Sequence, residues 1–298
     1  MFVLMNFYYF GRHGKPPLEC VLYANEQGAI SQTKKSVAST ERQESIATLK
    51  PDPKFLSSKK YERMAKNAHA KFDMELLRHD FIHKGVISFK PDFPDGVIEG
   101  AAALTQECLD KCPGGSNMPR ECKNLHQERF IDVASVRDVA LNYDILSVLA
   151  VLHGHDPYPF QTLNYPKSSL ARTHSDYVHF AAHPIALMSA AWVALMDIDP
   201  DAGPVFYYEG SHKLPSYNMQ DFGLDDRTKD VLNYARYQDI MTATMKRSGF
   251  VYREAVIKKG WVFIWSANLV VSLNLDLRFM FLMVVTHSFV LYSTGVQR

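Results

Sequence analysis

Apolar residues recur with helical spacing through the first half of the chain. Phe72, Leu76, Leu77 and Phe81 fall at helical spacing, which predicts a helix. Gly85 follows as a C-terminal stop. The run over residues 86–89 is then short, apolar and β-branched, which predicts a strand.

Two further helical stretches are predicted, over residues 95–112 and 135–152. Ser135 is a candidate N-cap for the first helical segment of the second stretch. The apolar side of that stretch is made by Val139, Leu141, Ile145, Leu146 and Leu149.

Strand patterns dominate from residue 157 onward. Turns rich in Pro, Asp and Gly separate them, and residues 225–246 read as an inserted helix. The predicted strands cover residues 160–165, 190–196, 205–208, 251–257 and 262–265. Helices first and short strands afterwards, without βαβ alternation, predict an α+β protein with a mainly β core, an antiparallel barrel or jelly roll.

The first 70 residues lack this periodicity. Residues 32–60 are rich in Ser, Thr, Lys, Gln and Pro, which is typical of a loop or disorder. We therefore expect a flexible N-terminal extension over residues 1–70 and one folded domain over residues 71–298.

Charge, the apolar N-terminal run and the cysteine spacing argue against nucleic acid, a membrane span and zinc. The formal net charge is +1, so no strong field would attract nucleic acid. The apolar run at residues 1–10 is too short to span a bilayer, and a cytoplasmic protein is expected, with a peroxisomal location left open. Zinc binding is disfavoured because the four cysteines, Cys20, Cys108, Cys112 and Cys122, do not form two tight pairs.

The chemistry centres on His174-Ser175-Asp176. Side chains two residues apart on a strand share a face, so the imidazole and the carboxylate lie together. A histidine and a carboxylate are two of the three ligands of a facial non-haem iron(II) site, whose other positions stay open. The other nearby histidines are interpreted as loop residues, and among them His179, three residues after Asp176, is the best candidate to line the mouth of such a site.

Residues 161–215 resemble the phytanoyl-CoA dioxygenase family of iron(II)/2-oxoglutarate oxygenases. The matching segments, in order, are Leu163-Asn164-Tyr165-Pro166, His174-Ser175-Asp176, Trp192-Val193-Ala194-Leu195, Asp201-Ala202-Gly203-Pro204 and Gly210-Ser211-His212. Lys259-Gly260 and Phe263-Ile264-Trp265 resemble a later strand of the family, so the likeness runs over about residues 72–269.

This resemblance implies a double-stranded β-helix (a cupin-like jelly roll) with flanking helices. It implies Fe(II) as metal, held by His174 and Asp176, with 2-oxoglutarate as co-substrate. The implied reaction is hydroxylation of an unactivated carbon of a small molecule with O₂. Trp192 aligns with a large residue near the keto-acid, and Gln161 and Asn164 are further candidates for the cofactor cavity; core packing is the alternative role for Trp192.

The pattern breaks after Leu269. The family's third ligand is a histidine, and Val271 stands in its place. The arginine that binds 2-oxoglutarate has no counterpart in register, since Arg278 does not fit. His287 lies in a context that matches a later, non-ligating histidine of the family.

Three explanations remain open. The chain is a non-catalytic protein on the same fold, or His287 replaces the ligand, or residues 270–298 are mistranslated. In the neighbouring frame, codons for residues 282–285 can read His-Gly followed by Gly or Ser, and a Val270 codon begins with GT like an intron. A spliced transcript that still encodes Val270-Val271-Ser272 would exclude mistranslation.

Overall fold

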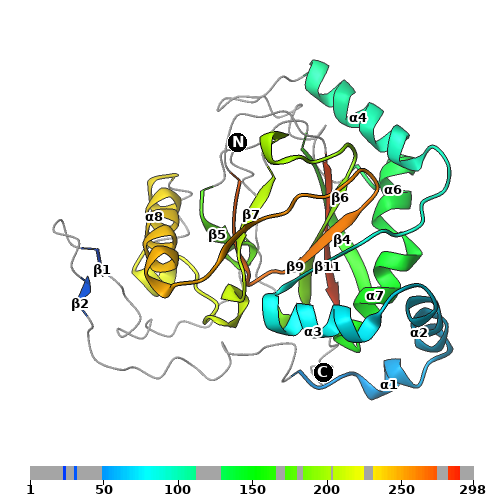
Figure 1. The fold of residues 1–298 in the computed structure, drawn as a ribbon, viewed down its shortest axis with the longest axis horizontal. Helices are drawn as coiled ribbons and strands as arrows, with labels where there is room; N and C mark the ends of the chain where they lie inside the picture. Colours follow the sequence, from blue (N-terminus) through cyan, green and yellow to red (C-terminus); the bar gives the residue numbers. More distant parts are fainter. Residues whose placement is uncertain are drawn as a thin grey trace, which may run out of the picture.

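The computed structural model describes residues 23–24, 30–31, 49–111, 129–165, 172–179, 184–202, 204–224, 231–273 and 281–288. These residues form a mixed structure of helices and antiparallel sheets (Figure 1). No helix among them is long and apolar enough to cross a membrane.

The larger sheet has five strands, all paired antiparallel with their neighbours. In spatial order they are β3 (Val86–Phe89), β9 (Val262–Ser266), β6 (Met188–Ala194), β11 (Phe281–Ser288) and β4 (Pro157–Tyr165). Strand β11 belongs to the atypical C-terminal part of the sequence, yet it pairs on both sides, with β6 and β4. It therefore presents no open edge in this sheet.

The smaller sheet has four antiparallel strands. In spatial order they are β5 (His174–Ser175), β10 (Val270–Leu273), β7 (Val205–Tyr208) and β8 (Tyr252–Glu254). Two further two-residue strands, β1 (Tyr23–Ala24) and β2 (Ile30–Ser31), pair with each other.

Alternating side chains divide the apolar residues into separate clusters, because successive residues of a strand face opposite sides. On β6, Trp192 packs between the two sheets, whereas Val193 packs against helices on the outer face. On β10, Val271 faces the same core between the sheets, whereas Val270 packs against the outer cluster that includes helix α8.

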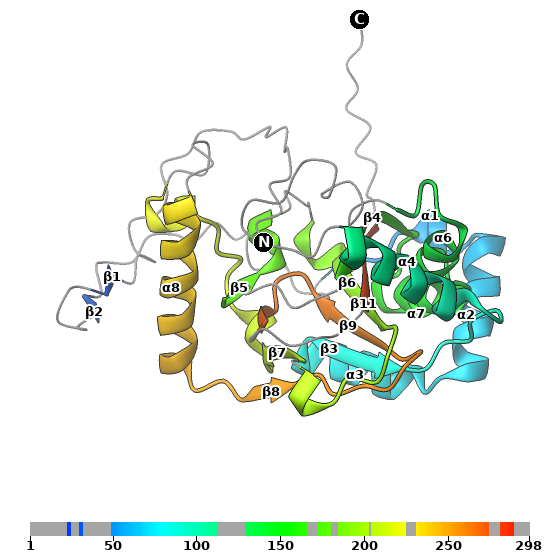
Figure 2. The same ribbon diagram turned by 90° about the horizontal axis from the view of Figure 1, so that it is seen from above.

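Helices cover both outer sides. Figures 1 and 2 show α8 (Val231–Ser248) beside the smaller sheet and the other helices grouped on the opposite side of the molecule. Those helices are α1 (Pro53–Leu56), α2 (Lys59–Lys71), α3 (Met74–Lys84), α4 (Val97–Lys111), α6 (Ala134–Ala140) and α7 (Tyr143–His153).

Two sequence expectations need correction. Residues 53–70, expected to be part of a flexible extension, form α1 and most of α2. The helical signal was weak because only Met64 and Ala68, four residues apart, bury completely on an otherwise polar α2. Ser135 is inside α6 rather than at its N-cap, which is Val133 and has no side-chain cap.

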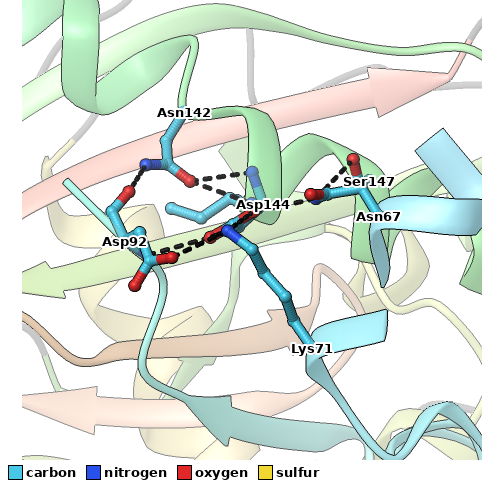
Figure 3. A network of polar contacts seen from close by, with 7 residues as sticks. Asn67, Lys71, Asp92, Asn142, Asp144 and Ser147 are labelled. Atoms are coloured by element: carbon cyan, nitrogen blue, oxygen red, sulfur yellow. Dashed lines mark hydrogen bonds and ion pairs between the residues drawn. The ribbon is translucent and has the colours of Figure 1, made fainter. Parts of the chain in front are cut away.

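A polar network ties α2 to the start of α7 (Figure 3). The buried Asp144 carboxylate accepts hydrogen bonds from Asn67 Nδ2 at 2.8 Å, Lys71 Nζ at 2.9 Å and the Asp92 N–H at 2.9 Å. Asn142 caps α7 and donates to the Asp92 carbonyl at 2.7 Å. Since each buried oxygen has partners, the network fixes where the N-terminal helices sit.

Candidate metal and 2-oxoglutarate site

His174 and Asp176 lie together at the edge of the smaller sheet. Strand β5 holds His174 and Ser175 only, and Asp176 begins a 3₁₀ turn that extends to His179. Asp176 is thus not on the strand, contrary to expectation, but its Oδ1 still lies 3.6 Å from His174 Nε2. Both side chains are buried.

A fixed partner orients each of these two groups. His174 Nδ1 donates to the Arg172 carbonyl at 2.7 Å, which leaves Nε2 as the nitrogen with the free lone pair in the neutral ring. The Trp265 indole Nε1–H donates to Asp176 Oδ2 at 2.8 Å, so Oδ1 is the oxygen that faces His174. Such outer partners set the orientation and basicity of metal ligands.

Helix α8 supports the histidine from behind the sheet. Gln238 Nε2 donates to the same Arg172 carbonyl at 3.3 Å. The Tyr237 hydroxyl lies 3.4 Å from Ser175 Oγ and donates to the Tyr217 carbonyl at 3.4 Å. Burial is the main cause that raises the pKa of the Tyr237 phenol to about 12. Tyr237 therefore acts as a neutral hydrogen-bonding group at physiological pH.

His179 lies beside His174, with ring centres 5.4 Å apart in an edge-on arrangement. Its Nε2 is 2.9 Å from the Tyr234 hydroxyl of α8. Burial is the main cause that lowers the pKa of His179 to about 4; His174 lowers it further and the Asp176 charge opposes this. The ring is therefore neutral at physiological pH.

The position opposite His174 is apolar. In the antiparallel pair of β10 and β5, Val271 is the Cα partner of His174, and Val270 is the partner of Ser175. Directly opposed residues present their side chains on the same face. Val271 is 3% exposed and packs in the core between the sheets. The strand register therefore places Val271 where a third ligand would stand.

The donor set is incomplete among the residues that the structure describes. Within them, no group of three His, Cys, Asp or Glu side chains is arranged to hold a metal ion. His174 Nε2 and Asp176 Oδ1 suit a non-haem iron site, but a third protein donor is lacking there. Arg278 lies outside the described residues, and of His287 only the backbone, in β11, is described.

The candidates for the keto-acid are on the larger sheet. Trp192 is fully buried in the core between the sheets, where its ring meets Phe263 edge-on at 6.4 Å. Gln161 is buried on β4, two residues from Leu163 and hence on the face toward that core. Asn164 is also on β4, but its side chain lies outside the described part.

The turn after β7 holds the strand that carries Val271. Ser211 Oγ accepts from the Val270 N–H at 2.9 Å, and Asn268 Nδ2 donates to the His212 carbonyl at 3.0 Å. Gly210 has φ 81°, a left-handed conformation that favours glycine. These contacts give the turn a structural role.

Sequence reasoning did not assign Trp265, Gln238, Tyr234 or Tyr237 to the site. Trp265 had a signal, since it ends the strand that resembles the family. The α8 residues had none, because helical periodicity does not reveal which strand a distant helix will cover.

Comparison with known proteins finds one family model that matches part of the chain. Residues 133–270 match the family model described as Phytanoyl-CoA dioxygenase (PhyH). The matched stretch ends at Val270, one residue before Val271. No curated protein matches the chain.

Several solved structures share the fold. The non-heme alpha ketoglutarate dependent carbocyclase SnoK is 16% identical, with a TM-score of 0.53 over 73% of this chain and 87% of SnoK. EctD from S. alaskensis, with 2-oxoglutarate and 5-hydroxyectoine, is 15% identical, with a TM-score of 0.52 over 83% of this chain and 82% of EctD. The epimerase SnoN, in complex with Fe3+, alpha ketoglutarate and nogalamycin RO, is 16% identical, with a TM-score of 0.50 over 72% of this chain and 83% of SnoN. At these identities the similarity shows the fold alone.

Proposed function

Since residues 133–270 match the phytanoyl-CoA dioxygenase family model, we propose that the chain is an iron(II)/2-oxoglutarate oxygenase whose metal site has lost one protein ligand. The two sheets are then the halves of a double-stranded β-helix. The reaction proposed for the intact site is hydroxylation of an unactivated carbon in a small molecule, with O₂ as oxidant.

The observation that carries this proposal is the pair of free donor atoms. The other polar atom of each side chain is occupied, by the Arg172 carbonyl and by the Trp265 indole. His174 Nε2 and Asp176 Oδ1 remain, 3.6 Å apart. Two ligands bound at about 2.1 Å in adjacent positions lie roughly 3 to 3.5 Å apart, which is close to this separation.

The donors among the described residues do not complete the site. Val271 offers no lone pair where the third ligand would stand. Two ligands hold Fe(II) more weakly than three, and we expect weak turnover or none from this chain. We assign Gln161, Asn164 and Trp192 to the 2-oxoglutarate side of the site on the family resemblance.

The second candidate is a non-catalytic protein that binds a small molecule on the same fold. Val271 favours this second candidate, because its apolar side chain in the ligand position extends the hydrophobic core between the sheets. On this account the site keeps its oriented histidine and carboxylate without catalysing oxidation.

Succinate release from 2-oxoglutarate under air, with and without added Fe(II), separates the two candidates. Slow, iron-dependent release that disappears in His174→Ala supports an oxygenase with a damaged site. Release that survives in His174→Ala refutes the assignment of this site. Absence of release, together with binding of 2-oxoglutarate in calorimetry, favours the binding protein.

A further inference from the structure

Two histidines lie one turn apart on the outer face of α3. His79 and His83 are four residues apart, and their ring centres are 4.4 Å from each other with the planes inclined by 42°. Both are exposed, and 63% of the His79 side chain is accessible. Residues four apart share a helix face, so the backbone itself holds the two rings together.

A carboxylate is placed behind the first histidine. His79 Nδ1 lies 3.3 Å from Asp80 Oδ1 and donates to it, which leaves Nε2 as the nitrogen with the lone pair. Asp80 Oδ2 accepts from Lys84 Nζ at 2.9 Å. An ionised carboxylate behind an imidazole is the usual outer partner of a metal-binding histidine.

We propose that His79 and His83 form a two-point surface site for a divalent transition ion such as Zn²⁺, Ni²⁺ or Cu²⁺. Imidazole nitrogen suits these ions. Two imidazoles bound at about 2.1 Å and at right angles have ring centres roughly 4.5 Å apart, which the 4.4 Å separation in α3 nearly equals. The site is distinct from His174 and Asp176 and does not depend on the proposed function.

The remaining coordination positions of the ion are open. No third His, Cys, Asp or Glu joins the pair within the described residues. His212, a half-buried histidine of the turn after β7, uses its Nε2 to donate to the Ile82 carbonyl at 3.0 Å. Water, or a donor side chain of another molecule, completes the coordination.

Calorimetric titration of the full chain with Ni²⁺ at neutral pH tests this site. His79→Ala and His83→Ala should each weaken binding by about tenfold or more, and the double variant should be no worse than either single one, because a chelate needs both rings. Asp80→Asn, which removes the charge behind His79, should weaken binding by about tenfold. Alanine is the best helix former, so these exposed substitutions preserve the fold.

His69→Ala is the matched control, since His69 is a solitary exposed histidine on α2. It should leave Ni²⁺ binding by the His79–His83 pair unchanged. A lower number of bound ions with unchanged affinity in His79→Ala and in His83→Ala would overturn the proposal, because it indicates separate monodentate histidines. Equal losses from His69→Ala, or no Ni²⁺ binding by the unaltered chain, would overturn it as well.

Discussion

Replacing Val271 by histidine should convert the two-donor site into a three-donor site. Val271 is the Cα partner of His174 across β10 and β5, and its side chain lies on the same face. The new imidazole would therefore stand beside the His174 ring, on a strand that Ser211 and Asn268 already hold in place. No backbone movement is required to bring the third donor to the site.

The expected gain in affinity follows from the energy of one ligand. Four-ligand zinc sites bind with about 10–16 kcal/mol, or about 3 kcal/mol for each ligand. At 1.4 kcal/mol for each factor of ten, one added imidazole should tighten metal binding roughly a hundredfold. The metal-free variant should lose about 1–3 kcal/mol of unfolding free energy, because histidine is larger than the valine it replaces in a packed core.

The measurement is anaerobic calorimetry with Fe(II), in a His79→Ala background so that the helix pair does not contribute. Val270→His is the matched control, because it makes the same change at the preceding residue. Val270 is 1% exposed and packs in the cluster that includes α8. Val271→His should gain affinity and Val270→His should not. Equal affinities in the two variants would refute the register argument.

Two other substitutions test the groups that orient the site and the fold. Trp265→Phe keeps the aromatic ring but removes the donor to Asp176, so Fe(II) binding should weaken by about tenfold and the unfolding free energy should fall by about 1–3 kcal/mol. The same change at the partly exposed Trp261 should do neither. Asp144→Ala removes an acceptor of hydrogen bonds from three groups and should cost about 3 kcal/mol in urea unfolding, against less than about 1 kcal/mol for Asp92→Ala, whose carboxylate is exposed. Burial would raise the pKa of Asp144, but its hydrogen bonds and the Lys71 charge lower it. The unfolding free energy that the Asp144 carboxylate adds is therefore fully present above the unfolded carboxyl pKa of about 3.9. It is lost as pH falls through the lower folded pKa, so the stabilities of Asp144→Ala and of the unaltered chain should become equal in acid. A difference in stability that stays constant down to acid pH would contradict this account.

Much of the local structure could be predicted from the chain. The helix that ends at Gly85 is α3, capped by a left-handed glycine with φ 82°. The apolar runs became β6 and β9, since a continuous apolar run matches a strand that is buried on both faces. The polar helix α2 was missed because only a narrow stripe of it is buried, which leaves little periodic signal.

The sequence by itself determined the mixed helix and strand content, the pairing of a histidine with a carboxylate two residues later, and the absence of histidine at position 271. Those features depend on residue type and short spacing. Only the tertiary structure decided that Val271 faces His174, that Trp265 binds Asp176, and that α8 lies behind Ser175. The reason is physical: periodicity records which face of an element is buried, whereas the register between strands far apart in the chain is set by how whole sheets pair and pack.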